Sequence, residues 1–316
     1  MKKTIQIGTL SAAAGEKKQG YYTLPKSTIQ MPVTIVNGCH EGKTVLITSG
    51  IHGGEYPGIQ TGIQLARELS PQQVHGAVVF IHPVNVSAFV TRSKQVMPED
   101  GQNLNRAFPG NNMGTITHRT AYALTRDFQS LADFYLDLHG GDLDELVTPY
   151  VYYPGVAEKS VIAASRAAAC LVDVSYMVRS NATTGAYNYA AIQGVPSLLI
   201  ERGGSGLWSR EEVEAYKKDV TNVLRHLHVL EGEPFVPKEP KEITNAIYLD
   251  ADFSGCWYPC VQVGQTLKKG DKLGEITDYF GNVQKAYYTP CDAVVLYITV
   301  TLGIEQGHPL LALGEI

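Results

Sequence analysis

A short apolar run that ends in two potential metal ligands constrains this chain more than any other feature. Residues 45–51 (VLITSGI) are apolar and rich in β-branched side chains, and His52-Gly-Gly-Glu55 follows directly. Such runs are typical of a strand covered on both faces in a parallel or mixed sheet, and these strands end at the edge where ligands bind. The glycine pair permits a sharp turn that would let His52 and Glu55 converge on one ion. Taken alone, the pattern fits equally well a loop that caps a helix beginning near Pro57.

Length and charge exclude several classes of protein. The chain has 316 residues, enough for one large domain and a small one, and 26 Lys and Arg against 31 Asp and Glu give a net charge of −5. No block of like charge suggests a nucleic-acid surface. No apolar run approaches the ~18 residues that span a bilayer, and Met1–Gln6 leads into a polar segment rather than a signal-peptide core. We therefore expect a cytoplasmic protein with no nucleic-acid or membrane partner.

Two later strands repeat the pattern of the first. Residues 134–139 (FYLDLH) end in His139 before two glycines, and residues 196–201 (PSLLIE) end in Glu201 before Arg202 and two glycines. Because the carboxyl ends of parallel strands meet at one edge of a sheet, these side chains should lie close to His52 and Glu55.

The order of the remaining segments predicts an α/β fold, with a mixed central sheet and helices on both faces. We expect antiparallel edge strands within 1–37 and a long, functional loop at 87–114. Further segments expected to be regular are strands at 77–85 and 176–179, and helices at 58–69, 116–131, 159–171, 185–193 and 210–230.

A proline-rich, charged stretch at 233–241 is the best candidate boundary. Beyond it the helical pattern disappears and short strands alternate with glycine turns. We expect an α/β domain that carries the candidate metal ligands at 1–232, a linker at 233–245 and a small all-β domain at 246–316. The five cysteines should be free thiols, and Cys256 with Cys260 lacks the second pair that a zinc finger needs.

Two imidazoles and one carboxylate form a three-ligand set for zinc. His52, Glu55 and His139 would leave a fourth position to water, as in catalytic rather than structural sites. Glu201 can then act as the general base toward that water. The alternatives for Glu201 are a fourth ligand or an ion pair with Arg202.

The loop at 87–114 carries candidate substrate-binding groups. Arg106 offers a fork of donors suited to a carboxylate, and Asn105 beside it adds a donor. Arg92 could stabilise the oxyanion formed when a carbonyl is attacked. Surface charges without a function are the alternative for both arginines.

Taken in order, four motifs resemble the succinylglutamate desuccinylase/aspartoacylase family of the zinc carboxypeptidase-like superfamily. The motifs are HGGE at 52–55, NLNRAFPG at 103–110, DLHG at 137–140 and ERGG at 201–204. The resemblance implies zinc on His52, Glu55 and His139, Glu201 as base, and Asn105 and Arg106 on a substrate carboxylate. Arg92 matches less well, so Lys94 is an alternative oxyanion donor.

The resemblance extends to the end of the chain. The small β domain is similar to a barrel-sandwich of the biotinyl/lipoyl type, but it lacks a modifiable lysine in the expected context. The family implies that this domain restricts access to the site, where Tyr287 or Tyr288 could supply a hydroxyl.

The leading functional hypothesis is a zinc-dependent amidohydrolase that deacylates a small N-acyl amino acid, with one zinc per chain. A zinc carboxypeptidase acting on peptides is the second, because the same ligand set serves both. A non-catalytic zinc-binding protein on the same fold is the third, although such a protein has no use for a base at Glu201. The acyl group and the oligomeric state, possibly a homo-oligomer, are not encoded in these motifs.

Overall fold

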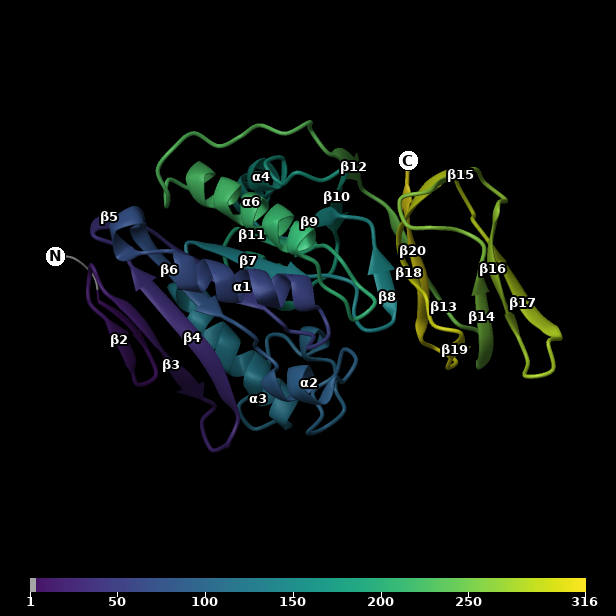
Figure 1. Cartoon of the computed structure of the whole chain (residues 1–316), viewed down its shortest axis with the longest axis horizontal. Helices are drawn as coiled ribbons and strands as arrows, with labels where there is room; N and C mark the ends of the chain where they lie inside the picture. Colours follow the sequence, from purple (N-terminus) through teal and green to yellow (C-terminus); the bar gives the residue numbers. More distant parts are fainter. Residues whose placement is uncertain (1–3) are drawn as a thin grey trace.

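A mixed sheet of nine strands forms the centre of the computed structural model, which describes residues 4–316 (Figure 1). Its spatial order is β12 (Lys241–Ile243), β10 (Tyr176–Ser180), β9 (Tyr150–Pro154), β11 (Ser197–Glu201), β7 (Phe134–His139), β5 (His40–Ser49), β6 (His75–Ile81), β4 (Gln30–Asn37) and β3 (Lys17–Thr23). The four central strands β11, β7, β5 and β6 run parallel, while β9 and β4 lie antiparallel on either side of them. The predicted α/β class with a mixed central sheet is confirmed.

Helices cover both faces of this sheet (Figure 1). One face packs against α1 (Tyr56–Glu68), α4 (Lys159–Ala169) and α6 (Arg210–His226). The other packs against α3 (Ile116–Ala123), α5 (Ala186–Ile192) and the hairpin of β1 (Ile5–Ile7) and β2 (Leu10–Ala12). Because the central strands are apolar on both faces, each face buries its own cluster of aliphatic and aromatic side chains.

The helix ends follow local sequence signals. Ser209 and Glu212 form a reciprocal capping box at the start of α6, since each side chain accepts a hydrogen bond from the backbone N–H of the other residue. The helix predicted at 116–131 is continuous but irregular, because α3 passes into a π-helical turn, Leu124–Phe128, and a 3₁₀ turn, Gln129–Leu131. A further 3₁₀ turn, Pro71–Gln73, precedes β6.

The last 71 residues of the fold contain strands only. One sheet contains β13 (Ala246–Asp250), β20 (Pro309–Glu315), β18 (Ala293–Thr299) and β15 (Thr266–Leu267), and the other contains β17 (Val283–Tyr288), β16 (Lys272–Thr277), β14 (Gly255–Pro259) and β19 (Gly303–Ile304). Strand β8 (Glu145–Val147) belongs to the first part of the chain but pairs with β18 (Figure 1). This pairing connects the C-terminal strands to the segment that leads from β7 to β9. We retain the division at 233–245 and the barrel-sandwich description as proposals.

Several segments differ from the sequence prediction. The expected loop at 87–114 includes a short helix, α2 (Val86–Thr91), because the Asn85 side chain caps it by accepting from Ala88 N, and a 3₁₀ turn, Leu104–Arg106. The linker expected at 233–245 is not wholly irregular, since β12 within it adds to the edge of the large sheet. Strands β8 and β9 were not predicted. The first three residues of the edge-strand segment 1–37 lie outside the described residues.

Among residues 4–316, none of the helices combines the length and the apolar character required to cross a bilayer. The five cysteines are free thiols, as the sequence predicts.

Candidate metal and substrate site

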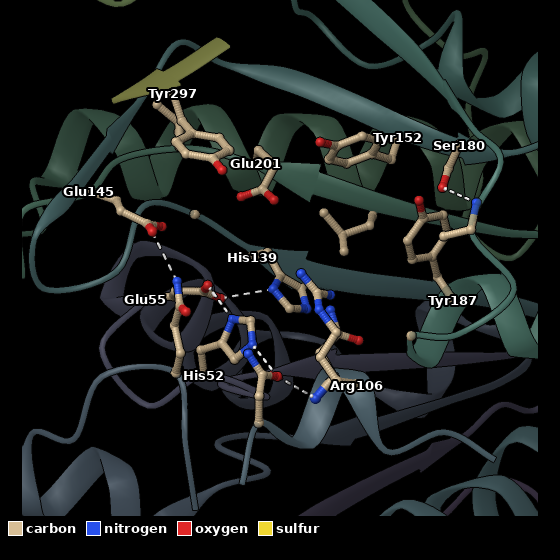
Figure 2. A pocket seen from close by; sticks show the side chains of 18 of the residues that line it. His52, Glu55, Arg106, His139, Glu145, Tyr152, Ser180, Tyr187, Glu201 and Tyr297 are labelled. Carbon is tan, nitrogen blue, oxygen red and sulfur yellow. Dashed lines mark hydrogen bonds and ion pairs between the residues drawn. The ribbon is translucent and has the colours of Figure 1, made fainter. Parts of the chain in front are cut away.

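Three parallel strands deliver the predicted site residues to one edge of the sheet. Glu201 at the end of β11 lies directly beside His139 at the end of β7. His52 and Glu55 follow β5, the neighbour of β7 on its other side, and Glu55 is the residue immediately before α1. Figure 2 shows all four side chains pointing into one cavity.

Glu55 lies between the two imidazoles. Its Oε1 is 2.7 Å from His52 Nδ1 and its Oε2 is 3.1 Å from His139 Nδ1. One donor atom from each of these three buried residues falls within 4.8 Å of the others. They form the single such cluster of three or more ligand-type side chains within residues 4–316.

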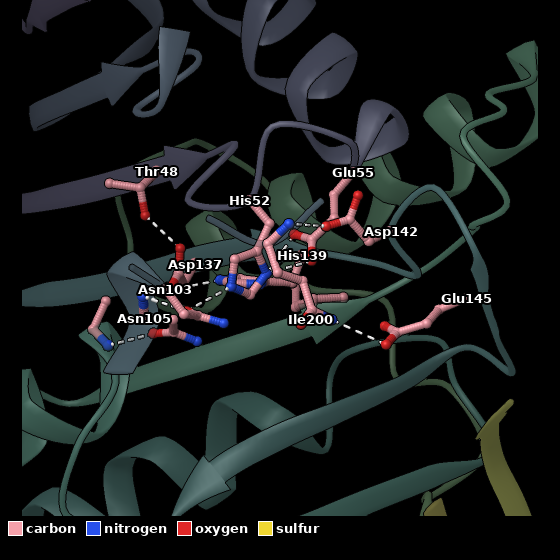
Figure 3. Close-up of polar contacts among 12 residues, drawn as sticks. Thr48, His52, Glu55, Asn103, Asn105, Asp137, His139, Asp142, Glu145 and Ile200 are labelled. Atoms are coloured by element: carbon pink, nitrogen blue, oxygen red, sulfur yellow. Dashed lines mark hydrogen bonds and ion pairs between the residues drawn. The ribbon is translucent and has the colours of Figure 1, made fainter. Parts of the chain in front are cut away.

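The far nitrogen of each imidazole faces an oxygen acceptor (Figure 3). His52 Nε2 is 3.2 Å from Asn103 Oδ1, and His139 Nε2 is 3.1 Å from Asp137 Oδ2. Asp137 is itself fixed by a 2.6 Å hydrogen bond from the Thr48 hydroxyl. Acceptors at Nε2 favour the tautomer that leaves the Nδ1 lone pair free, which is the arrangement that metal-ligating histidines require.

The three residues therefore fit a metal ion. Both Nδ1 atoms converge on the Glu55 carboxylate, one on each of its oxygens. Sequence reasoning assigned no role to Asn103 or Asp137. The signal for Asp137 was available, because residues two apart on a strand point to the same face, and Asp137 precedes His139 by two.

The two glycines of the HGGE motif are required by packing rather than by a left-handed backbone. A Cβ at Gly53 would lie 2.3 Å from Phe89 N, and one at Gly54 would lie 1.9 Å from Asp142 Oδ1. Neither glycine has a positive φ. The expected turn is present, since residues 53–54 form a turn and His52 and Glu55 meet, and glycine is needed there because α2 and Asp142 approach closely.

The pKa values of Glu55 and His139 are shifted by burial and by the charges of the neighbouring groups. Burial raises the pKa of the Glu55 carboxyl, but His139 and His52 lower it by more, to about 2. Burial lowers the pKa of His139, and Glu55 and Asp137 raise it well above its ordinary value. The three groups thus bind protons as a tight anionic and cationic cluster, and a metal ion held by them would release those protons.

Glu201 stands apart from this network. Its Oε2 is buried without a hydrogen-bond partner among the described residues, and burial raises its pKa well above the ordinary carboxyl value, although His139 opposes the shift. Arg202 does not pair with it, because the Arg202 guanidinium is held by Asp219 at 2.7 Å. The ion-pair alternative for Glu201 is thus not what the structure contains.

The cavity beside the cluster has a volume of about 360 Å³. Arg106 lines it with an exposed side chain that forms no ion pair with any described carboxylate. Asn105 also lines it, but its side-chain oxygen accepts a 2.9 Å hydrogen bond from Ala186 N at the start of α5. Only the amide nitrogen of Asn105 is left for a ligand.

Other predicted residues are not brought to this cavity. Arg92 ends α2 in a left-handed conformation (φ 55°), and its exposed side chain lines a separate surface depression with Tyr56 and Phe89. Lys94 is paired with Asp144 at 2.6 Å and does not line the cavity. The oxyanion role predicted for Arg92, with Lys94 as its alternative, is therefore corrected.

The tyrosines expected from the C-terminal strands are also different ones. Tyr287 packs in the core of that region, where its hydroxyl accepts from Asp252 N, and Tyr288 is exposed on its surface. Instead, Tyr248 of β13 and Tyr297 of β18 line the cavity.

Sequence reasoning missed these residues and several others in the wall. The hydroxyls of Tyr248 and Tyr152 are 2.9 Å apart, and Gln95 and Glu145 complete one end of the cavity. No local motif marks these positions, because they come from five segments that only the tertiary fold brings together.

Comparisons with known proteins agree with this geometry. Residues 41–227 match the family model of the succinylglutamate desuccinylase/aspartoacylase catalytic domain. The chain is 28% identical over 329 residues to the N-alpha-acetyl-L-2,4-diaminobutyric acid deacetylase of Halomonas elongata, with 98% of this chain and 94% of that protein covered.

Two solved structures are similar over 95% of both chains. The succinylglutamate desuccinylase/aspartoacylase of Rhodobacter sphaeroides is 27% identical with a TM-score of 0.84. The product-bound ectoine utilization protein EutE (DoeB) of Ruegeria pomeroyi is 25% identical with a TM-score of 0.85. The matched family model spans more than half of the chain and includes every predicted metal ligand, so this protein belongs to the succinylglutamate desuccinylase/aspartoacylase family.

Proposed function

We propose that this protein is a zinc-dependent amidohydrolase that removes the acyl group from a small N-acyl amino acid. The observation that carries the proposal is the convergence of His52, Glu55 and His139 beside the unpartnered carboxylate of Glu201 in one cavity. The names of the relatives support the same reaction class, since one is a deacetylase of an N-acetylated amino acid.

Zinc is the metal that this donor set favours. Two imidazoles and one carboxylate are a ligand set of catalytic zinc sites, which keep a further position open. In such sites zinc supplies Lewis-acid polarisation of a carbonyl oxygen and of water. In this chain His52, Glu55 and His139 would hold the ion, and Asn103 and Asp137 would orient the imidazoles.

Glu201 is assigned the proton transfers. Its carboxylate takes a proton from the attacking water while the water oxygen bonds to the amide carbon, and it returns the proton to the leaving nitrogen as the C–N bond breaks. The raised pKa of Glu201 suits both steps, because a carboxyl of raised pKa is a stronger base toward the water and holds the proton until the leaving nitrogen takes it.

Arg106 is assigned to the substrate carboxylate. Its guanidinium lines the cavity and forms no ion pair with a carboxylate of residues 4–316, and a bidentate pair would fix the substrate relative to the metal ligands. The Asn105 amide nitrogen can add a donor on the same side. The volume of about 360 Å³ is near the lower end for ligand pockets, which favours a small N-acyl amino acid over a peptide.

The test is hydrolysis of a panel of N-acyl amino acids by zinc-loaded protein, comparing wild type with Glu201→Gln. The substitution keeps the side-chain shape and removes the base, so we expect zinc content to stay constant while kcat falls by about 10²–10⁴-fold. Glu99→Gln, which removes an exposed charge outside the cavity lining, is the matched control. Near wild-type turnover in Glu201→Gln would overturn the mechanism, and loss of zinc would make Glu201 a ligand instead.

A further inference from the structure

Glu145 is a buried acid that the reaction above does not use. It begins β8, is 8% exposed, and lines the cavity next to Tyr297, which comes from the partner strand β18. Figure 2 shows Glu145 and Arg106 on opposite sides of the two histidines. A substrate whose amide lies at the cluster would therefore extend toward Arg106 at one end and toward Glu145 at the other.

The Glu145 carboxylate forms no ion pair within the described part of the chain. Its hydrogen-bond partner is the Gln95 side chain, whose Nε2 donates to Oε1 at 2.9 Å. Lys94 precedes Gln95 in the sequence, but the ammonium group of Lys94 is bound to Asp144. Within residues 4–316, no Lys, Arg or His side chain lies within ion-pair distance of Glu145.

A buried acid without a counter-ion is unusual. Carboxylates are almost never fully buried unless they are paired, because an amide donor satisfies a hydrogen bond without balancing the charge. Burial raises the pKa of Glu145 to about 7, more than the attraction of Lys94 lowers it. A positively charged group in the cavity would remove this penalty.

The fold also keeps this end of the cavity rigid. The backbone amide of Gln95, in a left-handed conformation (φ 54°), donates to Asp142 Oδ2 at 2.7 Å, and the backbone carbonyl of Glu145 accepts from Ser205 N. Contacts from three different loops thus hold Gln95 and Glu145 in place. Such support is typical of a binding site whose side chains are fixed before the ligand arrives.

We propose that Glu145, supported by Gln95, binds a protonated primary amine of the substrate, so that the enzyme acts on N-acyl amino acids that carry an ammonium group. The inference rests on the proposed function and narrows its substrate class. The amine has two possible sources: the side chain of the amino acid, as in an Nα-acylated diamino acid, or the acyl group, as in a β-alanyl amide. Both kinds of substrate would present an ammonium group to Glu145. Test substrates that carry the amine in only one of the two positions distinguish them.

The experiment compares amine substrates with neutral isosteres. The first arm uses Nα-acetylated diamino acids with two to four side-chain methylenes against acetyl-norvaline, acetyl-norleucine and acetyl-2-aminoheptanoate. The second uses β-alanyl-norleucine against butyryl-norleucine. Each is measured as kcat/KM for zinc-loaded wild type, Glu145→Gln and the control Glu99→Gln.

We expect wild type to prefer an amine over its isostere by at least about tenfold in one arm, as for a hydrogen-bonded ion pair in a cavity. In Glu145→Gln this preference should fall to near unity while the neutral isostere keeps its rate. A wild type without preference in either arm would overturn the proposal. So would an equal loss for amine and neutral substrates in Glu145→Gln, which would make Glu145 a general structural or acid group.

Binding separates failure of this inference from failure of the deacylase assignment. If no panel member is hydrolysed, the proposed function fails, and the subsite is then tested by calorimetric binding of free diamino acids, with norvaline and norleucine as neutral references. Tighter binding of the amine that disappears in Glu145→Gln supports the subsite. Equal binding of amine and neutral compounds in wild type overturns it.

Discussion

Replacing Asp137 by asparagine should weaken metal binding without removing a ligand. Asp137 is fully buried, and its two oxygens have separate duties: Oδ1 accepts from the Thr48 hydroxyl at 2.6 Å, and Oδ2 lies 3.1 Å from His139 Nε2. An asparagine has one side-chain oxygen. If that oxygen stays with Thr48, the amide NH₂ faces His139 Nε2 and favours the tautomer with the proton on Nδ1, the atom that faces Glu55.

The size of the effect follows from this orienting role. Loss of such a partner typically lowers metal affinity by about 10–100-fold, which corresponds to about 1.4–2.8 kcal/mol. We expect the upper half of that range, because Asp137 also loses its negative charge next to the cationic site. The affinity can be measured by competition between the protein and a chromophoric chelator for zinc.

Asp219→Asn provides the matched control. Asp219 is also buried and also holds a basic side chain, Arg202, but it contacts none of the three ligands. This variant should lose stability and keep its zinc affinity. The reasoning is refuted if Asp137→Asn binds zinc within about twofold of wild type, or if Asp219→Asn loses as much affinity as Asp137→Asn.

Three further outcomes are expected. Arg106→Ala should lose about 1.5–3 kcal/mol of transition-state binding, measured as kcat/KM, and the loss should vanish for a substrate whose carboxylate is amidated. His139→Ala should remove most of the bound zinc by metal analysis, and unchanged stoichiometry would exclude it from the ligand set. In metal-free protein, burial raises the pKa of Glu145 from its ordinary value of 4.5 when unfolded to about 7 when folded, so the stability it contributes is present below pH 4.5 and is lost as the pH rises through 7. Denaturant unfolding should therefore show Glu145→Gln gaining up to about 3 kcal/mol on wild type between these pH values, and parallel curves would contradict the raised pKa.

Local sequence patterns are enough to predict the strands that carry the candidate metal ligands. His52, His139 and Glu201 each follow an apolar strand, and parallel strands place their carboxyl ends at one edge, so local patterns were sufficient to bring these residues together. The alternation of side chains along a strand also predicts that Asp137 lies on the same face as His139 and can contact it.

Tertiary structure decided the rest of the site. Whether Arg92 or Gln95 reaches the cavity depends on where α2 ends and how the following turn is held by Asp142, which lies 47 residues further along the chain than Gln95. The C-terminal strands contain several tyrosines. Tyr297 lies in the cavity wall because β18 pairs with β8, whereas Tyr287 packs in the core of the C-terminal region.

The physical reason for this division is the range of the interactions. Strand ends and helix caps are set by side chains within a few positions of one another, so a sequence window contains their causes. A cavity wall is set by packing and strand pairing between segments far apart in the chain, and no local window contains those contacts. Glu145 acquires its raised pKa and its place opposite Arg106 only through that packing.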